Sequence, residues 1–386
     1  MQRGPAGEYR IDISSGEAVR AFVPKPLPPQ PALVIEGARG RLLERATLAV
    51  GRLDSISALL PDPQLFLYTY VRREAVVSSQ IEGTQSTLAQ LLLFELDEAP
   101  GVPIDDVQEV SNYVAALEHG MQRMREGFPL SNRLLREMHG KLLSSGRGSE
   151  KLPGQFRRTQ NWIGGTRPGN AQFIPAPPQE LENCMAALER YIHAPESPYP
   201  ALIDAALVHV QFETIHPFLD GNGRIGRLLI ALMLQEKQVL REPLLYLSLF
   251  FKRHRAEYYR RLDAVRTAGD WEGWLDFFLE GVAETADGAV RTAQRLTALF
   301  ERDAEHIRVQ GLGDSALLVL QCFRRRPLAT LAELRSMTGK TLPTITKAVT
   351  KLVESGIVRE ITGRQRSRVY AYAEYLAVLN EGGEAL

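Results

Sequence analysis

The segment from His216 to Arg227, HPFLDGNGRIGR, gathers residue types that could transfer a phosphoryl or nucleotidyl group. His216 is a side chain suited to accepting a hydroxyl proton near neutral pH. Asp220 supplies a hard carboxylate oxygen of the kind that Mg²⁺ takes beside phosphates. Arg224 and Arg227 are three residues apart, so both project from the same side of the helix that begins here. Together, a base, a carboxylate and two cations predict phosphoryl or nucleotidyl transfer.

The glycines of the same segment allow its backbone to approach an anion. Gly221 and Gly223 stand where the chain turns into a new helix, IGRLLIALMLQEK, and glycine allows a ligand to approach the backbone. The free N–H groups at a helix N-terminus form an anion site. The alternative interpretation is an ordinary loop before a helix, in which the two arginines are solvated and His216 is a cap.

The segment resembles the Fic signature HPFx(D/E)GNGRxxR at every fixed position. The resemblance implies a protein adenylyltransferase (an AMPylator), in which His216 deprotonates a Ser, Thr or Tyr hydroxyl of a target protein, or of the enzyme itself. That hydroxyl attacks the α-phosphorus of ATP and expels pyrophosphate. Asp220 would hold Mg²⁺ between the α- and β-phosphates. The ATP contacts implied by the resemblance are those of Gly221, Asn222, Gly223 and Arg224, with Arg227 at the γ-phosphate.

A second segment, SSQIEG at residues 78–83, resembles the inhibitory motif (S/T)xxxE(G/N) of many Fic proteins. Its place before the signature resembles the class whose inhibitory helix precedes the Fic core. The resemblance implies an inhibitory role for Ser78, Glu82 and Gly83, with Glu82 pairing with Arg227 and keeping the γ-phosphate from binding productively. A charge-assisted, bidentate pair could hold that carboxylate in place. Taken without the resemblance, Ser78 and Glu82 are one turn of an exposed helix.

The elements around these motifs indicate an all-α Fic core. Residues 32–282 have an almost entirely helical pattern, and ALIDAALVHVQFETI at residues 201–215 predicts a central buried helix. Residues 154–178, rich in Gly, Pro, Asn and Gln, predict an irregular segment, which resembles the small β-hairpin flap of the family. Residues 1–31 contain five prolines between Pro24 and Pro31 and predict an extended arm along the surface, neither helix nor central strand.

Several aromatic and histidine residues have a structural as well as a functional interpretation. Tyr258 and Tyr259 could stack on the adenine base of ATP. His139 and His209 are expected to be packed core histidines, because each lies in a helical pattern. Trp271 and Trp274 are likewise expected in the core.

The C-terminal part predicts a winged helix-turn-helix domain, of the α+β class. Three helical patterns are followed by two β-prone runs that flank an arginine-rich tip, GRQRS. This composition suits a helix in the DNA major groove and a wing against phosphate. A protein-interaction or dimer module is the alternative, so DNA and a homodimer partner both stay open. The predicted divisions are an N-terminal region with the inhibitory helix (1–105), the Fic core (106–285), a linker helix (286–312) and the winged helix (313–386).

Composition limits the classes of protein to which this chain can belong. The formal net charge is zero, so the whole chain has no bulk attraction for nucleic acid or an anionic membrane. Two cysteines, far apart, predict neither a disulfide framework nor a metal site, and the absence of a long apolar run predicts a cytoplasmic, unanchored protein. Three functions stay open: AMP transfer to proteins, removal of AMP by the same site with Glu82 positioning a water, and DNA-binding regulation with the Fic core as sensor.

Overall fold

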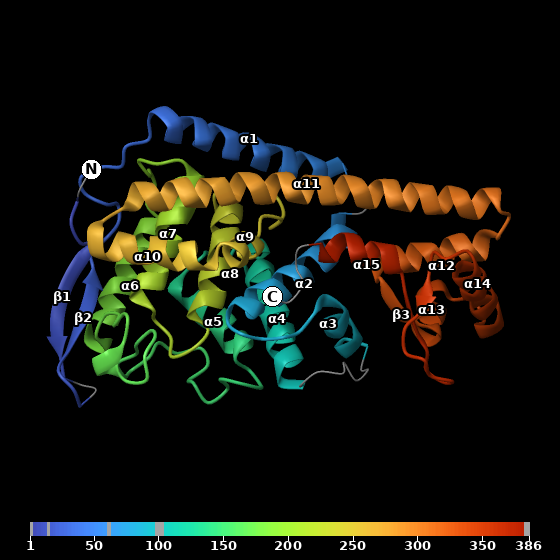
Figure 1. The fold of residues 1–386 in the computed structure, drawn as a ribbon, viewed down its shortest axis with the longest axis horizontal. Helices are drawn as coiled ribbons and strands as arrows, with labels where there is room; N and C mark the ends of the chain where they lie inside the picture. Colours follow the sequence, from blue (N-terminus) through green and yellow to red (C-terminus); the bar gives the residue numbers. More distant parts are fainter. Residues whose placement is uncertain (1–2, 14–15, 60–62, 97–103, 382–386) are drawn as a thin grey trace.

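Two long helices lie side by side along one edge of the molecule in the computed structural model (Figure 1). They are α1 (Gly37–Leu59) and α11 (Trp271–Val309). The structure describes the chain except residues 1–2, 14–15, 60–62, 97–103 and 382–386. α11 begins where the Asp270 carboxylate accepts a hydrogen bond from the backbone N–H of Gly273, and it then buries apolar residues at helical spacing over 39 residues.

The helical core lies beneath this pair. It consists of α2 (Pro63–Ile81), α3 (Leu88–Phe94), α4 (Ile104–Arg125), α5 (Asn132–Leu142), α6 (Pro178–Ile192), α7 (Ala201–Ile215), α8 (Asn222–Glu236), α9 (Ser248–Arg253) and α10 (Arg255–Ala268). α7 is buried at every position after its first residue, so it has no solvent face and forms the centre of the bundle. The helical core and the buried central helix were both predicted, and the mostly helical fold is confirmed.

The N-terminal arm is more ordered than the sequence indicated. β1 (Gly7–Asp12) and β2 (Val19–Pro24) pair antiparallel, from Gly7 opposite Pro24 to Asp12 opposite Val19. The predicted extended backbone is present, and β1 and β2 form a two-stranded sheet, so each is an edge strand and neither is a central one, as expected. Most of the prolines follow the second strand. The Phe22 N–H donates to the carbonyl of Ile174 at 2.8 Å, which ties the hairpin to the flap.

The flap itself, residues 154–178, is irregular. Its antiparallel pairing within the described residues is one bridge, Ile163 opposite Phe173, with a single 3₁₀ turn at Pro168–Asn170 between them. This is less regular than the small hairpin that the resemblance implied.

The C-terminal part contains α12 (Asp314–Arg325), β3 (Leu328–Thr330), α13 (Leu331–Thr338), α14 (Leu342–Glu354), β4 (Arg359–Glu360), β5 (Val369–Ala371) and α15 (Ala373–Asn380). Its antiparallel sheet has the strand order β3-β5-β4. Three helices and a terminal hairpin were expected, whereas β3 and α15 were not. On α14, Ile345, Val349 and Leu352 are buried, whereas Leu342 is exposed.

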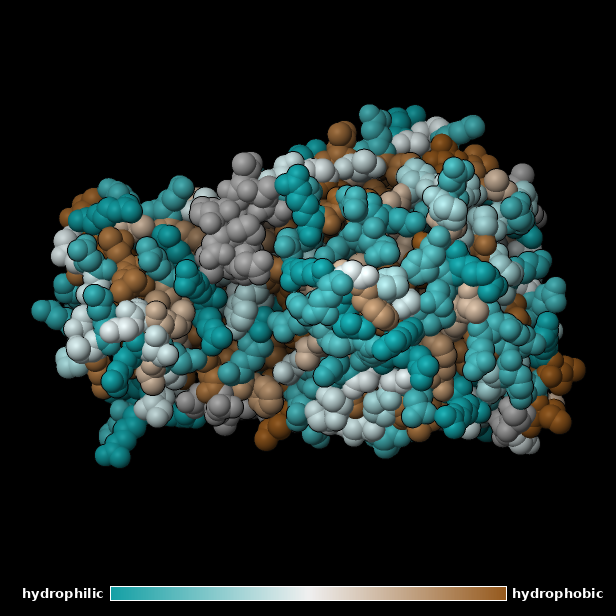
Figure 2. Space-filling view, turned by 180° about the vertical axis from the view of Figure 1, so that it is seen from behind, coloured by the Kyte–Doolittle hydropathy of each residue, from teal (hydrophilic) through white to brown (hydrophobic). Residues whose placement is uncertain are grey.

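The C-terminal elements are joined to the helical core by α11 and by contacts with α2. α11 runs unbroken across residues 285 and 286, so the predicted boundary of the linker helix falls inside one helix (Figure 1). The hydroxyls of Thr69 on α2 and Tyr375 on α15 hydrogen-bond at 3.1 Å in a buried position. On the face shown in Figure 2, apolar residues form small separate groups among polar ones. No helix in the described ranges is long and apolar enough to span a bilayer.

Candidate active site

The loop between α7 and α8 is shaped by its own side chains. Its residue His216 ends α7 in the left-handed region, at φ 52° and ψ 61°. Asn222 then closes the loop, since its Oδ1 accepts from the Phe218 N–H and its Nδ2 donates to the Phe218 carbonyl, both at 2.8 Å. Gly221 precedes α8 at φ 77°, a conformation that favours glycine. The first N–H groups of α8 are thereby presented at the loop without partners inside the helix.

His216 lies at this loop with a neutral imidazole. Burial lowers the pKa of His216 to about 3, and the positive charges of Arg157 and Arg266 act in the same direction. Its Nδ1 is buried, and a hydrogen bond between the ring and the backbone of Glu213 acts in the opposite direction, towards a higher pKa. Nε2 is therefore the ring nitrogen available to a proton donor, and it can accept a proton at neutral pH.

Arg157, which the sequence did not single out, fixes the position of His216 from the flap. Its guanidinium donates to the His216 carbonyl at 2.9 Å, to the Thr159 carbonyl at 3.2 Å and to the Ala176 carbonyl at 2.5 Å. Among the described residues, no carboxylate forms an ion pair with it, and burial lowers its pKa to about 10. Arg157 therefore links the flap to the loop between α7 and α8 by hydrogen bonds.

Asp220 and Arg224 form a small network with α4. Arg224 is 1% exposed in its side chain and donates to Glu109 at 2.5 Å and to Asp220 Oδ1 at 3.1 Å. Asp220 Oδ1 also accepts from the Gly221 N–H, while a Cβ at Gly148 would lie 3.1 Å from Oδ2. His139 supports the loop from behind, donating from Nε2 to the Asp220 carbonyl at 3.0 Å.

These residues fit a magnesium ion that binds mainly through substrate. The Asp220 side chain is 37% exposed, so it can be reached from the loop. No group of three or more potential ligand side chains occurs in the described part of the chain. Mg²⁺ in nucleotide sites commonly takes one or two carboxylates and completes its shell with phosphates and water. Asp220 is the residue that could hold it here, with Glu109 engaged by Arg224 beside it.

Arg227, one turn further along α8, points to α2 instead. Its Nε donates to Ser78 Oγ at 2.8 Å, and its Nη2 donates to the Ser78 carbonyl at 3.0 Å and to Glu82 Oε1 at 2.8 Å. Burial acts to raise the pKa of Glu82, but the charge of Arg227, its hydrogen bond and the charge of Arg224 together outweigh burial, so the carboxyl is held below its usual pKa. A Cβ at Gly223 would lie 2.4 Å from Glu82 Oε1, so glycine is needed for this contact.

Gly83 completes the segment. It follows α2 at φ 103°, which glycine tolerates, and its N–H donates to the Gln80 carbonyl at 3.1 Å. The structure thus brings Ser78, Glu82 and Arg227 together, although 149 residues separate Ser78 from Arg227 in sequence.

Comparisons with known proteins bear on the same two regions. Residues 40–122 match the family described as Fic/DOC family N-terminal, and residues 129–234 match the Fic/DOC family. Two separate regions of the chain are therefore similar to Fic/DOC family domains. The first of them includes α2 with Ser78 and Glu82, and the second includes the loop from His216 to Arg227.

Curated relatives include the protein adenylyltransferase Fic of Drosophila grimshawi, 28% identical over 210 residues, which are 54% of this chain and 40% of that protein. The protein of the same name from Culex quinquefasciatus is 30% identical over 212 residues, 54% of this chain and 39% of that one. The chain therefore spans about two fifths of the length of the curated relatives that it matches.

Solved structures share the fold. A Fic family protein from Desulfovibrio desulfuricans G20 covers 89% of this chain and 98% of its own, with a TM-score of 0.58 and 20% identity. Fic-1 from C. elegans covers 67% of this chain and 74% of its own, with a TM-score of 0.51 and 21% identity. At these identities the likeness concerns the fold alone.

The two tyrosines predicted to stack on adenine differ in their exposure. Tyr258 is 1% exposed, is stacked on Phe251 at 4.4 Å between ring centroids, and donates to His209 Nε2 at 2.9 Å. Its ring offers no accessible face to a base, so the prediction was wrong for Tyr258. Tyr259 is 42% exposed. Its pKa is raised, mainly by burial and next by the negative charge of Glu82. Only Tyr259 keeps a face that a base could cover.

The remaining predicted core residues are buried as expected. His209 is fully buried, and its Nδ1 donates to the Gly226 carbonyl at 2.8 Å. His139 is also fully buried and stacks on Phe218, and Trp274 donates to the Ala206 carbonyl at 2.9 Å. His209 and Trp274 do not contact the loop, whereas His139 supports it through the Asp220 carbonyl.

Glu213 is a further buried ionisable group that the sequence analysis did not single out. It lies on α7 one turn before His216, and burial raises its pKa to about 7. A Cβ at Gly226 would lie 2.2 Å from its Oε1, so this carboxyl occupies space that the glycine of α8 leaves free. A lone glutamate in a nearly all-apolar helix was the only available signal.

Proposed function

We propose that this chain is a protein adenylyltransferase that moves AMP from Mg·ATP to a Ser, Thr or Tyr hydroxyl of a protein, itself included, and is held back by Glu82. The observation that carries the proposal is the arrangement around the N-terminus of α8. There a neutral His216, the carboxylate of Asp220 and two buried arginines surround unpartnered N–H groups, and Glu82 engages one of the arginines. The fold and the names of the curated relatives support it.

In the proposed reaction, the target hydroxyl oxygen forms a bond to the α-phosphorus of ATP. The bond from that phosphorus to the bridging oxygen breaks, and pyrophosphate leaves. His216 Nε2 takes the hydroxyl proton, which it can do because its imidazole is neutral well below pH 7. Arg157 holds the backbone of His216 while this happens.

The phosphates are bound by α8. Its first N–H groups and the guanidinium of Arg224 offer donors to the α- and β-phosphates. Mg²⁺ bound at Asp220 would offset charge on the departing pyrophosphate. Arg224 is already fixed by Glu109, so little side-chain freedom is lost when a phosphate binds.

Inhibition in this proposal is competition for Arg227. Its Nη2 already donates to Glu82 and to the Ser78 carbonyl, and its Nη1 is buried without a partner. A γ-phosphate must displace Glu82 to reach this guanidinium. The same carboxylate could position a water for removal of AMP from a modified protein, which is the alternative reaction at this site.

The target would dock on the flap. Ile163 and Phe173 already form one antiparallel bridge there, and an extended segment can add to such an edge through main-chain hydrogen bonds with little side-chain selectivity. Both cysteines of the described chain are free and buried, which suits the reducing cytoplasm that we propose as the compartment.

The C-terminal elements favour a second candidate function, DNA-binding regulation through a winged helix. Thr346, Lys347 and Thr350 lie exposed on α14, and the exposed residues 363–368 between β4 and β5 carry Arg366 and Arg368. A recognition helix beside a basic wing is the composition required. Loss of DNA binding on Lys347→Glu in the full chain, measured by gel shift at several salt concentrations, would support this role, and absence of any shift would exclude it.

The adenylyltransferase proposal is tested with labelled ATP and purified protein. Glu82→Gly protein should gain a mass of one AMP on hydroxyl side chains, and the double variant with His216→Ala should not. Retention of labelling in the double variant would refute the assignment of His216 as the base.

A further inference from the structure

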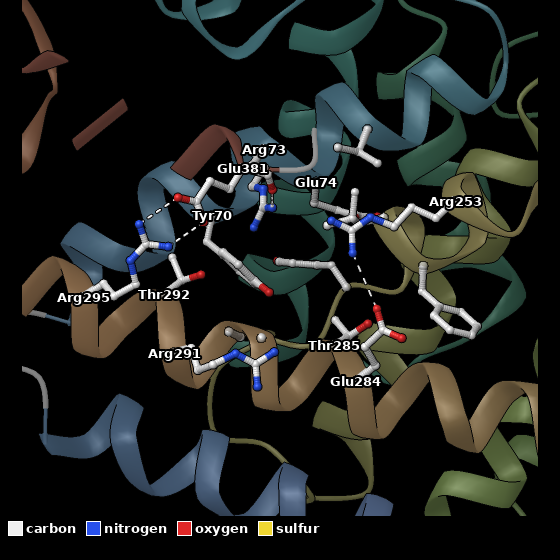
Figure 3. A pocket seen from close by; sticks show the side chains of 16 residues that line it. Tyr70, Arg73, Glu74, Arg253, Glu284, Thr285, Arg291, Thr292, Arg295 and Glu381 are labelled. Carbon is white, nitrogen blue, oxygen red and sulfur yellow. Dashed lines mark hydrogen bonds and ion pairs between the residues drawn. The ribbon is translucent and has the colours of Figure 1, made fainter. Parts of the chain in front are cut away.

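A cavity of about 270 Å³ lies against α2, away from the catalytic loop, between α2, α9 and α11 (Figure 3). Neither the proposed catalytic residues nor the comparisons assign it a role. Its volume is near the lower end of small-molecule sites. The figure shows Arg73 of α2 and Arg291 of α11 at the same opening, with Tyr70 between them.

The cavity is rich in arginine. Of its four guanidinium groups, Arg295 pairs with Glu381 at 2.5 Å and Arg253 pairs with Glu284 at 3.5 Å. Arg73 donates only to a backbone carbonyl, that of Glu381, at 2.6 Å. Within the described residues, neither Arg73 nor Arg291 forms an ion pair with a carboxylate. Two positive charges therefore face this space without a direct ion pair, and the carboxylates whose pKa values the Arg73 charge lowers are Glu74, which also lines the cavity, and Glu381.

Two buried polar groups in the wall also lack partners. Arg73 Nε and the hydroxyl of Tyr246 are both buried, and no hydrogen bond to either occurs among the described groups. Tyr246 as a whole is 5% exposed. A buried polar group without a partner is destabilising, so each is an indication that a ligand or ordered water completes the site.

The rest of the wall combines aromatic rings and small apolar residues with the polar side chains of Glu74, Glu284, Thr285 and Thr292. Tyr70, Tyr246 and Phe250 line it, with Tyr70 and Tyr246 ring centroids 5.6 Å apart. Aromatic walls favour a planar apolar group, and the arginines favour a phosphoryl or carboxylate group attached to it.

We propose that this cavity binds a small aromatic anion, with its phosphate or carboxylate between Arg73 and Arg291 and its ring against Tyr70 and Phe250. The Tyr246 hydroxyl donates to the same ligand. The site is separate from the ATP site on α8, because its wall is formed by residues of α2, α9 and α11 with Tyr246 and Glu381.

A ligand in this cavity would affect inhibition by Glu82, a consequence that rests on the proposed function. Arg73 and Glu74 lie on α2 within two turns of Ser78. Glu74 accepts hydrogen bonds from Tyr113 at 3.1 Å and from Ser248, so α2 is anchored at this point. The cavity has its present shape while Glu82 contacts Arg227, and a ligand that fits this shape favours this state. The anion is thus expected to strengthen inhibition.

Binding is tested by calorimetry on the full chain with phenyl phosphate and, separately, benzoate, in excess chelator. We expect one site that weakens tenfold or more in Arg291→Glu and about threefold or more in Tyr246→Phe. Arg308→Glu, an exposed arginine on the same helix but outside the cavity, is the matched control and should bind as the unmodified chain does. Arg227→Ala should also leave binding unchanged.

Each outcome decides the proposal. Preference for one of the two probes identifies the anion as phosphate or carboxylate. Equal binding by Arg291→Glu and the unmodified chain, or no binding of either probe, overturns the site. Loss of binding in Arg227→Ala means that the probe occupies the ATP site instead. For the regulatory step, phenyl phosphate should lower self-modification by the unmodified chain and leave Glu82→Gly unaffected. Equal effects on both would refute that step while the calorimetry stands by itself.

Discussion

Replacement of Glu82 by glycine is expected to raise self-modification about 30-fold. The carboxylate makes one charge-assisted hydrogen bond to Arg227, at 2.8 Å, and its side chain is 31% exposed. Such a bond contributes about 2 kcal/mol, and each 1.4 kcal/mol is a factor of ten, which gives roughly 30-fold in the competition between Glu82 and the γ-phosphate.

The structure also indicates that this substitution leaves the fold intact. α2 ends at Ile81, so a glycine at position 82 lies beyond the helix and costs little helix propensity. Arg227 keeps both of its contacts to Ser78. We expect a loss of unfolding free energy of about 1–3 kcal/mol, visible as a modest decrease in Tm.

The assay is incorporation of labelled AMP per chain over time, with intact-mass spectrometry to count the groups added. Glu82→Gln, which keeps the shape and removes the charge, should fall between the two. Glu95→Gly is the matched control, because Glu95 pairs with Arg72 of α2 at a similar distance, 2.8 Å, but does not contact Arg227. An increase of the same size in the Glu95 variant, or none in Glu82→Gly, would refute the competition argument.

Three further predictions concern single side chains. His216→Ala should lower AMP transfer by about 10²–10⁴-fold with ATP affinity nearly unchanged. In the unmodified protein, burial lowers the pKa of His216 to about 3, so an NMR titration without nucleotide should find its imidazole neutral at pH 5. A midpoint near pH 6.5 would contradict this. Asp220→Ala should abolish most of the AMP transfer, and the activity that is left should no longer depend on Mg²⁺. Full activity of the unmodified chain in excess chelator would exclude the metal role. Tyr258→Phe should destabilise the fold by about 1–3 kcal/mol, because His209 loses its buried donor, without changing KM for ATP, and a raised KM would restore the adenine role.

The catalytic loop could be predicted from sequence because its chemistry is local. Base, carboxylate, glycines and arginines lie within one turn and the helix that follows it, so their types and spacing already determine which groups face a ligand. The helical core was predictable for a similar reason, since an apolar pattern at helical spacing is a local property.

The residues that support the loop were not predictable in this way. Glu109 meets Arg224 across 115 residues of chain, and Arg157 reaches the His216 carbonyl across 59. A glutamate in one helix and an arginine in a flap have no distinguishing spacing before the helices are packed. Tyr258 was misassigned for the same reason, because burial against Phe251 is decided by tertiary packing.

The two arginines of the motif show where sequence reasoning ends. Three residues along an α-helix correspond to a rotation of about 300° and a rise of about 4.5 Å, so Arg224 and Arg227 start from one side yet diverge by about 60°. That difference is enough for Arg224 to meet Glu109 of α4 and for Arg227 to meet Ser78 of α2 and Glu82, which directly follows α2. The spacing predicted that both arginines would face a phosphate. The packing of α4 and α2 against α8 instead assigns Arg224 to a network with Glu109 and leaves Arg227 to Glu82, the carboxylate that ATP would displace in the proposed function.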